Sequence, residues 1–340
     1  MNQTVTVFGA TGHTWQFVVA ELHRRGWSVI ASGRDAARLE ALVAGTGATE
    51  VRVATIDDPA SLDRALAGAS AVINCAGPFA DTAAPVIDAA LRAGIPYVDI
   101  AAEVEAVADT HHKYDVPARE AGIAILPAMA FYGGFGDLLA TAAMGDWETA
   151  DEIHLAYALS SWRPTAGTRA SGVVSKGRRD GRRLVYADGR LQLRDDAAPV
   201  TTWAFPNPVG VQQVAAEFTT ADSVTIPRHL RTTTLHSYMT TAAIQDLFAA
   251  DPRPPTATDA SGRSAQTFLI EVVARSRGEE RRAVARGRDI YAVTAPLVVE
   301  ATTRLLETPS AAGVFAPGEL FDAAKFLQSL DVDGLTVELP

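Results

Sequence analysis

Short apolar runs alternate with longer amphipathic stretches over roughly the first 130 residues of the chain. The run at residues 4–9 ends in glycine, and the stretch after it, residues 13–26, spaces Phe17, Val18 and Leu22 along one helical face. Similar apolar runs follow at residues 28–34, 51–57, 70–78, 96–103 and 123–129. Strands that alternate with helices of this length indicate a parallel sheet covered on both faces. The pattern therefore predicts an α/β domain over residues 1–130, with the doubly wound (Rossmann) sheet that binds dinucleotides.

The pattern changes at about Phe131 to longer runs that are typical of antiparallel strands. These runs cover residues 151–161, 212–220, 230–240, 265–276 and 280–289, and the last two flank the turn "RGE". We predict a second, α+β domain at residues 131–288, built on a mostly antiparallel sheet. Helical patterns over residues 289–340 predict C-terminal helices that pack back on the first domain. An exposed edge of the second sheet favours a homodimer.

Composition narrows the class of protein. Of the 340 residues, 48% are hydrophobic and 21% are charged, which is ordinary for a globular protein. The net charge of -10 disfavours nucleic-acid partners and docking on an anionic membrane. Cys75 is the only cysteine, so a disulfide within the chain and a cysteine-based zinc site are excluded, and we expect no metal site. The chain shows no leader pattern and no apolar run of membrane-spanning length, so we expect a cytoplasmic protein that acts on a small molecule.

The turn "GATGHT" after the first strand carries the first candidate binding residues. Gly9 permits a tight turn, and Gly12 lets a pyrophosphate approach the N-terminus of the next helix. We predict that Thr11, His13 and Thr14 take part in the same contact. A tight turn without any ligand would also explain these glycines.

The end of the second predicted strand, "ASGRDAARL", indicates which dinucleotide is bound. NAD-binding folds place an acidic residue here, whereas this chain has Ser32, Gly33 and Arg34, with Arg38 one turn later. Cations suit a 2′-phosphate, which predicts NADP(H). The alternative is that Arg34 is a solvated loop residue.

Two further loops are predicted at the carboxyl edge of the sheet. Asp57 ends the third strand, where it contacts the adenine or caps the next helix. The loop "NCAGP" follows the fourth strand and contributes Asn74, Ala76, Gly77 and Pro78 to the cofactor site. A plain backbone turn would also account for Gly77 and Pro78.

Candidate catalytic residues follow the fifth and sixth strands. "YVDIAAE" supplies Tyr97, Asp99 and Glu103, and "AFYGGFGDLLA" supplies Tyr132. A carboxylate at Asp99 or Glu103 would stabilise an iminium cation, and Tyr132 would donate a proton. For each of these residues a helix cap or an internal hydrogen bond is an equally good explanation. No tyrosine is followed by lysine four residues later, which excludes the short-chain dehydrogenase pair.

These segments together resemble one enzyme family. "FGATGHT", "SGRDAARL", "NCAGPF", "YVDIAAE" and the late "GRDIYAVTAPLVVEATTRLLE" are similar to the saccharopine dehydrogenase-like oxidoreductases. The resemblance implies a Rossmann domain, an α+β dimerisation domain and NADP-dependent reduction of a C=N bond, or of a C=C bond in the enoyl reductase relatives. The family turn reads GxTGxTGR, and this chain has Trp15 and Gln16 at the last two positions.

Trp15 leaves three hypotheses for function. The first is an NADPH-dependent reductase of a C=N or C=C bond in a small, hydrophobic organic substrate. The second is a non-redox cyclase or isomerase in which Trp15 fills part of the cofactor groove, and the third is a dinucleotide sensor. The third glycine normally allows close packing of helix on sheet. An indole there therefore shifts the helix outward, points into the groove or faces another packing surface.

Overall fold

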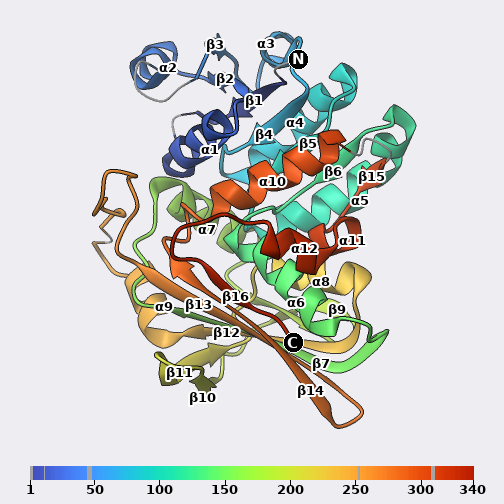
Figure 1. Ribbon diagram of the computed structural model, residues 1–340, viewed down its shortest axis with the longest axis vertical. Coiled ribbons are helices and arrows are strands. Elements are labelled where there is room, and N and C mark those ends of the chain that lie inside the picture. Colours follow the sequence, from blue (N-terminus) through green and yellow to red (C-terminus); the bar gives the residue numbers. More distant parts are fainter. Residues whose placement is uncertain (1–2, 11, 44–47, 252, 308–310) are drawn as a thin grey trace. The chain divides into compact units, whose positions relative to one another are not determined.

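The computed structural model describes residues 3–10, 12–43, 48–251, 253–307 and 311–340. The chain forms two compact units (Figure 1). The first comprises residues 1–130 and 294–315, and the second comprises residues 131–293 and 316–340.

The first unit is built on a parallel sheet of seven strands in the order β15-β6-β5-β4-β1-β2-β3. The strands are β1 (Thr4–Phe8), β2 (Ser28–Gly33), β3 (Glu50–Val53), β4 (Ala71–Asn74), β5 (Tyr97–Asp99), β6 (Ala124–Leu126) and β15 (Gly313–Val314). The order reverses beside β1, which confirms the predicted doubly wound fold. The seventh strand, β15, was not predicted, because two residues are too few to give a pattern.

Helices cover the first sheet. They are α1 (His13–Arg24), α2 (Ala36–Val43), α3 (Pro59–Leu66), α4 (Phe79–Ala93), α5 (Val104–Ala121) and α10 (Thr294–Glu307). Two residues fix the start of α3. The Asp58 carboxylate accepts the backbone N–H of Ala60 at 3.1 Å, and Pro59 takes the first helical position. The side chains of α3 and α4 bury a core against the sheet that includes Leu62, Val86 and Ile87.

The second unit is built on a separate seven-stranded sheet in the order β10-β11-β12-β7-β13-β14-β16. Its strands are β7 (Thr149–Leu159), β10 (Val200–Phe205), β11 (Gly210–Ala216), β12 (Arg231–Thr240), β13 (Thr267–Ser276), β14 (Glu279–Arg288) and β16 (Thr336–Glu338). Neighbouring strands are antiparallel except β12 and β7, which run parallel. This confirms the mostly antiparallel sheet. A hairpin of β8 (Arg183–Ala187) and β9 (Arg190–Arg194) forms a separate two-stranded sheet that contacts β12.

The helices of the second unit include several that the sequence pattern did not predict. They are α6 (Gly136–Met144), α7 (Ala166–Arg178), α8 (Asp222–His229), α9 (Thr241–Leu247), α11 (Pro317–Leu320) and α12 (Ala323–Gln328), with an irregular turn at Phe131–Phe135 before α6. The end of the chain differs from the expectation for residues 289–340. Residues 294–315 belong to the first unit, but α12 packs on α6 and β16 pairs with β14 in the second. This arrangement buries Phe326 and Leu327 and gives β14 a hydrogen-bonding neighbour.

Candidate cofactor and active site

The turn between β1 and α1 requires glycine at its first position. Gly9 has a φ of +87°, and a β-carbon there would lie 2.5 Å from the backbone nitrogen of Ala76. The Gly9 amide donates to the carbonyl of Ser32 at 2.9 Å, and the Gly12 amide donates to the carbonyl of Gly9 at 3.1 Å. The turn is therefore held closely between the ends of β2 and β4, as a phosphate-binding turn must be.

The N-terminus of α1 is open to an anion. Gly12 occupies the N-cap position and has no side chain to cap the helix, and the first turn carries no acidic residue. The N–H groups at a helix N-terminus and the helix dipole together favour a phosphate there. His13 and Thr14 are the first two residues of the helix, whereas Thr11 lies outside the described residues.

Trp15 belongs to the packed face of α1. Its side chain is 1% exposed, and it begins a stripe of buried residues at helical spacing that continues through Val18, Val19 and Leu22. The helix contacts β2 and α10. Among the described residues, the indole nitrogen has no hydrogen-bond partner. Of the three placements open from sequence, the structure therefore favours the packing surface over the cofactor groove.

The corner after β2 presents two cations. Ser32 and Gly33 are buried at the end of the strand, while Arg34 and Arg38 are exposed. Within the described part of the chain, neither arginine side chain makes an ion pair, so both are available to a 2′-phosphate. Asp57 is exposed, and the capping role considered for it is taken by the next residue, Asp58.

The loop after β4 is shaped by Asn74. Its carbonyl oxygen accepts the backbone N–H of Ala76 at 2.9 Å, and its amide nitrogen donates to the Tyr97 hydroxyl at 3.1 Å. The Gly77–Pro78 peptide bond is cis, and Gly77 is exposed. Asn74 therefore sets the conformation of the loop, while the loop backbone beyond it forms the surface beside the Gly9 turn.

Tyr97 and Asp99 form a buried pair at the carboxyl edge of the first sheet. The Tyr97 hydroxyl donates to Asp99 at 2.8 Å, and the other oxygen of Asp99 accepts the backbone N–H groups of Ala101 at 3.0 Å and Ala128 at 2.7 Å. Burial raises the pKa of Asp99 to about 6. The pair joins the end of β5 to the segment after β6, so these hydrogen bonds are made within the protein.

Glu103 caps a helix of the same unit. Its two carboxylate oxygens accept the first backbone N–H groups of α4, from Phe79 at 2.7 Å and Ala80 at 2.9 Å. The side chain is buried, and the helix dipole stabilises its negative charge. Glu103 is therefore engaged as the cap that the sequence left as the alternative to a catalytic role.

Tyr132 lies in the second unit, in a group of aromatic side chains. Its ring centroid is 5.1 Å from that of Tyr157 and 5.3 Å from that of Trp162. Its hydroxyl is buried and has no hydrogen-bond partner among the described residues. Burial raises the pKa of Tyr132 well above its usual value, so the hydroxyl keeps its proton.

The aromatic group contacts a buried carboxyl, that of Asp222, which the sequence analysis did not identify. Asp222 accepts the Tyr157 hydroxyl at 2.8 Å, the Thr220 hydroxyl and the backbone N–H of Gly133 at 3.0 Å. Burial raises the pKa of Asp222 to about 7. A β-carbon at Gly136 would lie 2.7 Å from the Tyr157 hydroxyl and would overlap the Asp222 carboxylate.

The sequence held a partial signal for Asp222. The glycines of "YGGFG" indicated a close approach, and the approaching group is this carboxylate. Asp222 itself is separated from those glycines by more than eighty residues, so nothing in the local pattern connected them.

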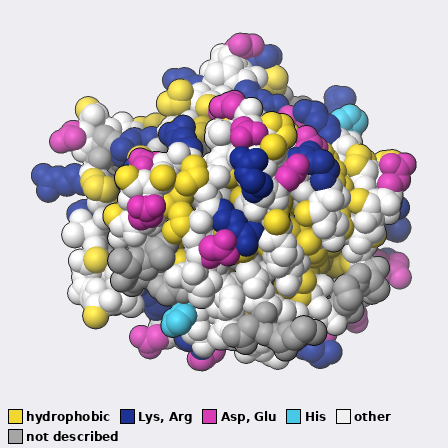
Figure 2. Space-filling model, turned by 90° about the horizontal axis from the view of Figure 1, so that it is seen from above, with side chains coloured by type: hydrophobic (Ala, Val, Ile, Leu, Met, Phe, Trp, Pro, Cys, Tyr) yellow, Lys and Arg dark blue, Asp and Glu magenta, His cyan; other side chains and the backbone are white. Residues whose placement is uncertain are grey.

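Charge on the surface is mixed. Figure 2 shows arginine and lysine side chains interspersed with aspartate and glutamate on the face that it displays. Helices of the described residues include none with both the length and the apolar character needed to cross a membrane.

Comparison with known proteins gives a family match within the first unit. Residues 5–126 match the family model described as the saccharopine dehydrogenase NADP binding domain. This match confirms the resemblance stated from the sequence and supports NADP(H) as the cofactor of the first unit.

Curated relatives carry similar descriptions. Proteins named saccharopine dehydrogenase-like oxidoreductase from Rattus norvegicus and Homo sapiens are 31% and 33% identical to this chain, over 37% of it and 34% of their own length. The chain thus aligns with about a third of the length of these relatives. A relative from Caenorhabditis elegans, 29% identical over 36% of this chain and 32% of its own, is named a lipid droplet localized protein.

Solved structures share the complete fold. Apo saccharopine dehydrogenase (L-Glu forming) from Saccharomyces cerevisiae covers 100% of both chains with a TM-score of 0.69 and 13% identity. Amine dehydrogenase from Mycobacterium smegmatis covers 95% of this chain and 97% of its own with a TM-score of 0.52 and 12% identity. At these identities the likeness concerns the fold alone.

Proposed function

We propose, from the premise that the first unit belongs to the saccharopine dehydrogenase NADP-binding domains, that this protein is an NADPH-dependent reductase. Its substrate is a small, hydrophobic organic molecule with a C=N or C=C bond. The observation that carries the proposal is the close turn at Gly9, which leads to the glycine-capped N-terminus of α1 and is accompanied by exposed arginines after β2. Phosphates bind best where a helix N-terminus and cations occur together.

The position of Trp15 supports retention of the cofactor. The Trp15 side chain is 1% exposed and belongs to the core stripe of α1, while Gly12 at the N-cap of that helix is exposed. The cyclase or isomerase hypothesis needed the indole to fill part of the groove, so it has less support. The sensor hypothesis makes the same binding prediction and differs only in turnover.

Reduction of a double bond needs a hydride and a proton, which come from different sources. Bound NADPH would supply a hydride to one carbon of the double bond, and the enzyme would supply a proton to the other atom of that bond. Tyr132 is our candidate for the proton, because its buried hydroxyl stays protonated at neutral pH. The ring of Tyr157 packs against that of Tyr132, and its hydroxyl donates to Asp222. Because the pKa of Asp222 is about 7, its carboxyl can carry a second proton near neutral pH.

The carboxyl edge of the first sheet favours C=N over C=C as the reduced bond. Asp99 and Glu103 are both buried acidic groups there, and a negative potential stabilises a cationic iminium more than a neutral alkene. We propose that they act through this potential, with Tyr97 positioning Asp99. Neither carboxylate need touch the substrate for this effect.

A substrate panel tests the proposal. The full chain is incubated with NADPH and a set of cyclic imines, aldehyde–amine pairs and activated alkenes, and NADPH oxidation and product are both measured. Product formed with matching NADPH consumption is expected for imines. Turnover without NADPH consumption would instead establish the cyclase or isomerase, and tight NADPH binding without turnover across the panel would favour the sensor.

Assembly and location stay predictions. We propose a homodimer formed through the second unit, where the edge strand β10 exposes Val200. Light scattering of the purified chain should give twice the mass of one chain, and a monomer would contradict it. A cytoplasmic location is checked by cell fractionation.

A further inference from the structure

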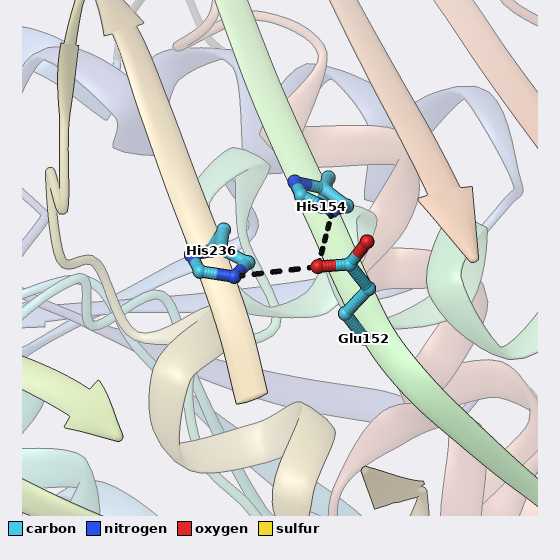
Figure 3. A group of neighbouring side chains, drawn as sticks. All are labelled: Glu152, His154 and His236. Atoms are coloured by element: carbon cyan, nitrogen blue, oxygen red, sulfur yellow. Dashed lines mark ion pairs between the residues drawn. The ribbon is translucent and has the colours of Figure 1, made fainter. Parts of the chain in front are cut away.

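Two histidines and a glutamate meet on one face of the second sheet. Glu152 and His154 are two residues apart on β7, so both side chains lie on the same face of that strand. His236 lies on the neighbouring strand β12, directly opposite His154 in the register. Figure 3 shows both imidazole rings with a nitrogen directed at the Glu152 carboxylate.

The spacing of the donor atoms is that of metal ligands. The Glu152 carboxylate oxygen lies 3.2 Å from Nε2 of His154 and 3.7 Å from Nε2 of His236, and all three donor atoms lie within 4.8 Å of one another. Ligands bound at about 2.0–2.2 Å to a tetrahedral zinc ion are separated by about 3.4 Å. Two of the three separations lie close to this value, and the third is no more than 4.8 Å.

We propose that Glu152, His154 and His236 bind a divalent transition-metal ion of the Zn²⁺ class. Two imidazole nitrogens with one carboxylate suit such ions and are a poor set for Mg²⁺ or Ca²⁺, which prefer oxygen ligands. His154 is 8% exposed, whereas Glu152 and His236 are 33% and 37% exposed. An ion can therefore enter from solvent and keep at least one position for water.

The surroundings of His154 resemble the outer shell of a metal site. The Tyr238 hydroxyl lies 3.2 Å from Nδ1 of His154, and a partner on that nitrogen leaves Nε2 free for the metal. The Tyr238 and Trp203 rings lie beside the imidazole, with centroids 5.9 Å and 5.7 Å from it. These contacts restrict the rotation of the ring, which reduces the ordering that metal binding would require.

Arg275 provides a competing cation at the same place. Its Nη1 lies 2.9 Å from Glu152 and 3.4 Å from Nε2 of His154. The guanidinium also pairs with Glu280 at 3.0 Å, and its side chain is 45% exposed. Binding of a metal ion would move Arg275 toward Glu280. Removal of this arginine should therefore raise metal affinity, the opposite of the effect expected at the ligands.

The test is metal titration of the full chain without a histidine tag. Zn²⁺ is titrated against a chromophoric chelator, and Co²⁺ is added to read its coordination from the absorption spectrum. The wild type should bind one ion per chain. Glu152→Gln and His236→Ala should each lower affinity by more than about 100-fold, and Tyr238→Phe by about 10–100-fold. Arg275→Gln should bind Zn²⁺ more tightly than the wild type.

His23→Ala is the matched control, because His23 is an exposed histidine on α1, outside the cluster. It should bind Zn²⁺ like the wild type. Circular dichroism confirms that each variant is folded. The proposal is overturned if the folded wild type binds no ion at micromolar Zn²⁺, or if Glu152→Gln and His236→Ala bind as it does. Neither readout involves NADPH, so failure here leaves the proposed reductase untouched.

Discussion

The turn at Gly9 lies against the backbone of Ala76, so closely that a β-carbon on Gly9 would come within 2.5 Å of the Ala76 nitrogen. This contact joins the first turn of the cofactor site to the loop after β4. Both glycine properties are used here, the positive φ of +87° and the missing side chain.

Gly9→Ala should therefore both destabilise the protein and weaken cofactor binding. Backbone strain alone is worth about 1–3 kcal/mol, and the clash with Ala76 adds to it by displacing the loop. Urea unfolding and NADPH titration measure the two effects. Gly26→Ala is the control, because Gly26 has a similar φ of +78° but no atom within 4 Å of an added β-carbon. Equal losses of stability and of NADPH affinity in the two variants would show that the contact with Ala76 is unimportant.

Trp15→Ala should cost stability and spare the cofactor. Loss of a fully buried tryptophan typically lowers the free energy of unfolding by about 3–5 kcal/mol. NADPH affinity, measured under conditions where the variant is folded, should stay near that of the wild type. Trp27→Ala, at a half-buried position of the same unit, should lose less stability. A variant that keeps its stability but loses activity would place the indole in the active site after all.

Asp222 should make stability depend on pH. Burial raises its pKa to about 7 from its ordinary value of 3.8, so between about pH 4 and 7 the folded state binds the proton that the unfolded state has lost. The free energy of unfolding therefore falls as pH rises through this window, by at most about 1.4 kcal/mol per pH unit for this group.

Asp222→Asn isolates the contribution of Asp222 to the pH dependence of the free energy of unfolding. Asp99 contributes with the same sign up to its pKa of about 6, so the difference between wild type and variant is the informative quantity. Urea unfolding at several pH values should show the variant gaining on the wild type from pH 4.5 to 7 and no further change above that. A pH-independent difference would mean that Asp222 titrates normally.

Tyr132→Phe tests the proton donor. The change removes one hydroxyl that has no hydrogen-bond partner among the described residues, so the fold should be preserved. Loss of a general acid lowers kcat by about 10²–10⁴-fold. NADPH affinity should not change. Tyr186→Phe, at a partly exposed tyrosine of β8, is the control and should keep full activity. Full activity of Tyr132→Phe would exclude it as the donor.

The first unit could be predicted from the sequence because its signals are local. Strand, glycine turn and helix follow each other within some twenty residues, and the cations at Arg34 and Arg38 come directly after a strand. The burial of Trp15 could not be predicted, because the same helical spacing fits a core residue and a groove residue. The helix α10, against which α1 packs, lies almost three hundred residues away in the chain.

The roles of polar residues were the hardest to predict. Glu103 caps α4 rather than its own helix α5, and Asp222 meets Tyr157 across the second unit. The Glu152–His154–His236 cluster depends on the parallel pairing of β12 with β7, two strands separated by about eighty residues. Such contacts arise from sheet register, which no short motif encodes.

The central claim is that the first unit holds NADPH through the amides of α1 and the arginines after β2. Calorimetric titration of the full chain with NADPH and with NADH tests it most directly, alongside the double variant Arg34→Ala/Arg38→Ala. A charged hydrogen bond is worth about 1.5–3 kcal/mol, so the wild type should bind NADPH at least about tenfold more tightly than NADH. The double variant should lose this preference while keeping its NADH affinity. Absence of NADPH binding in the folded wild type, or equal affinity for the two dinucleotides, would contradict the account.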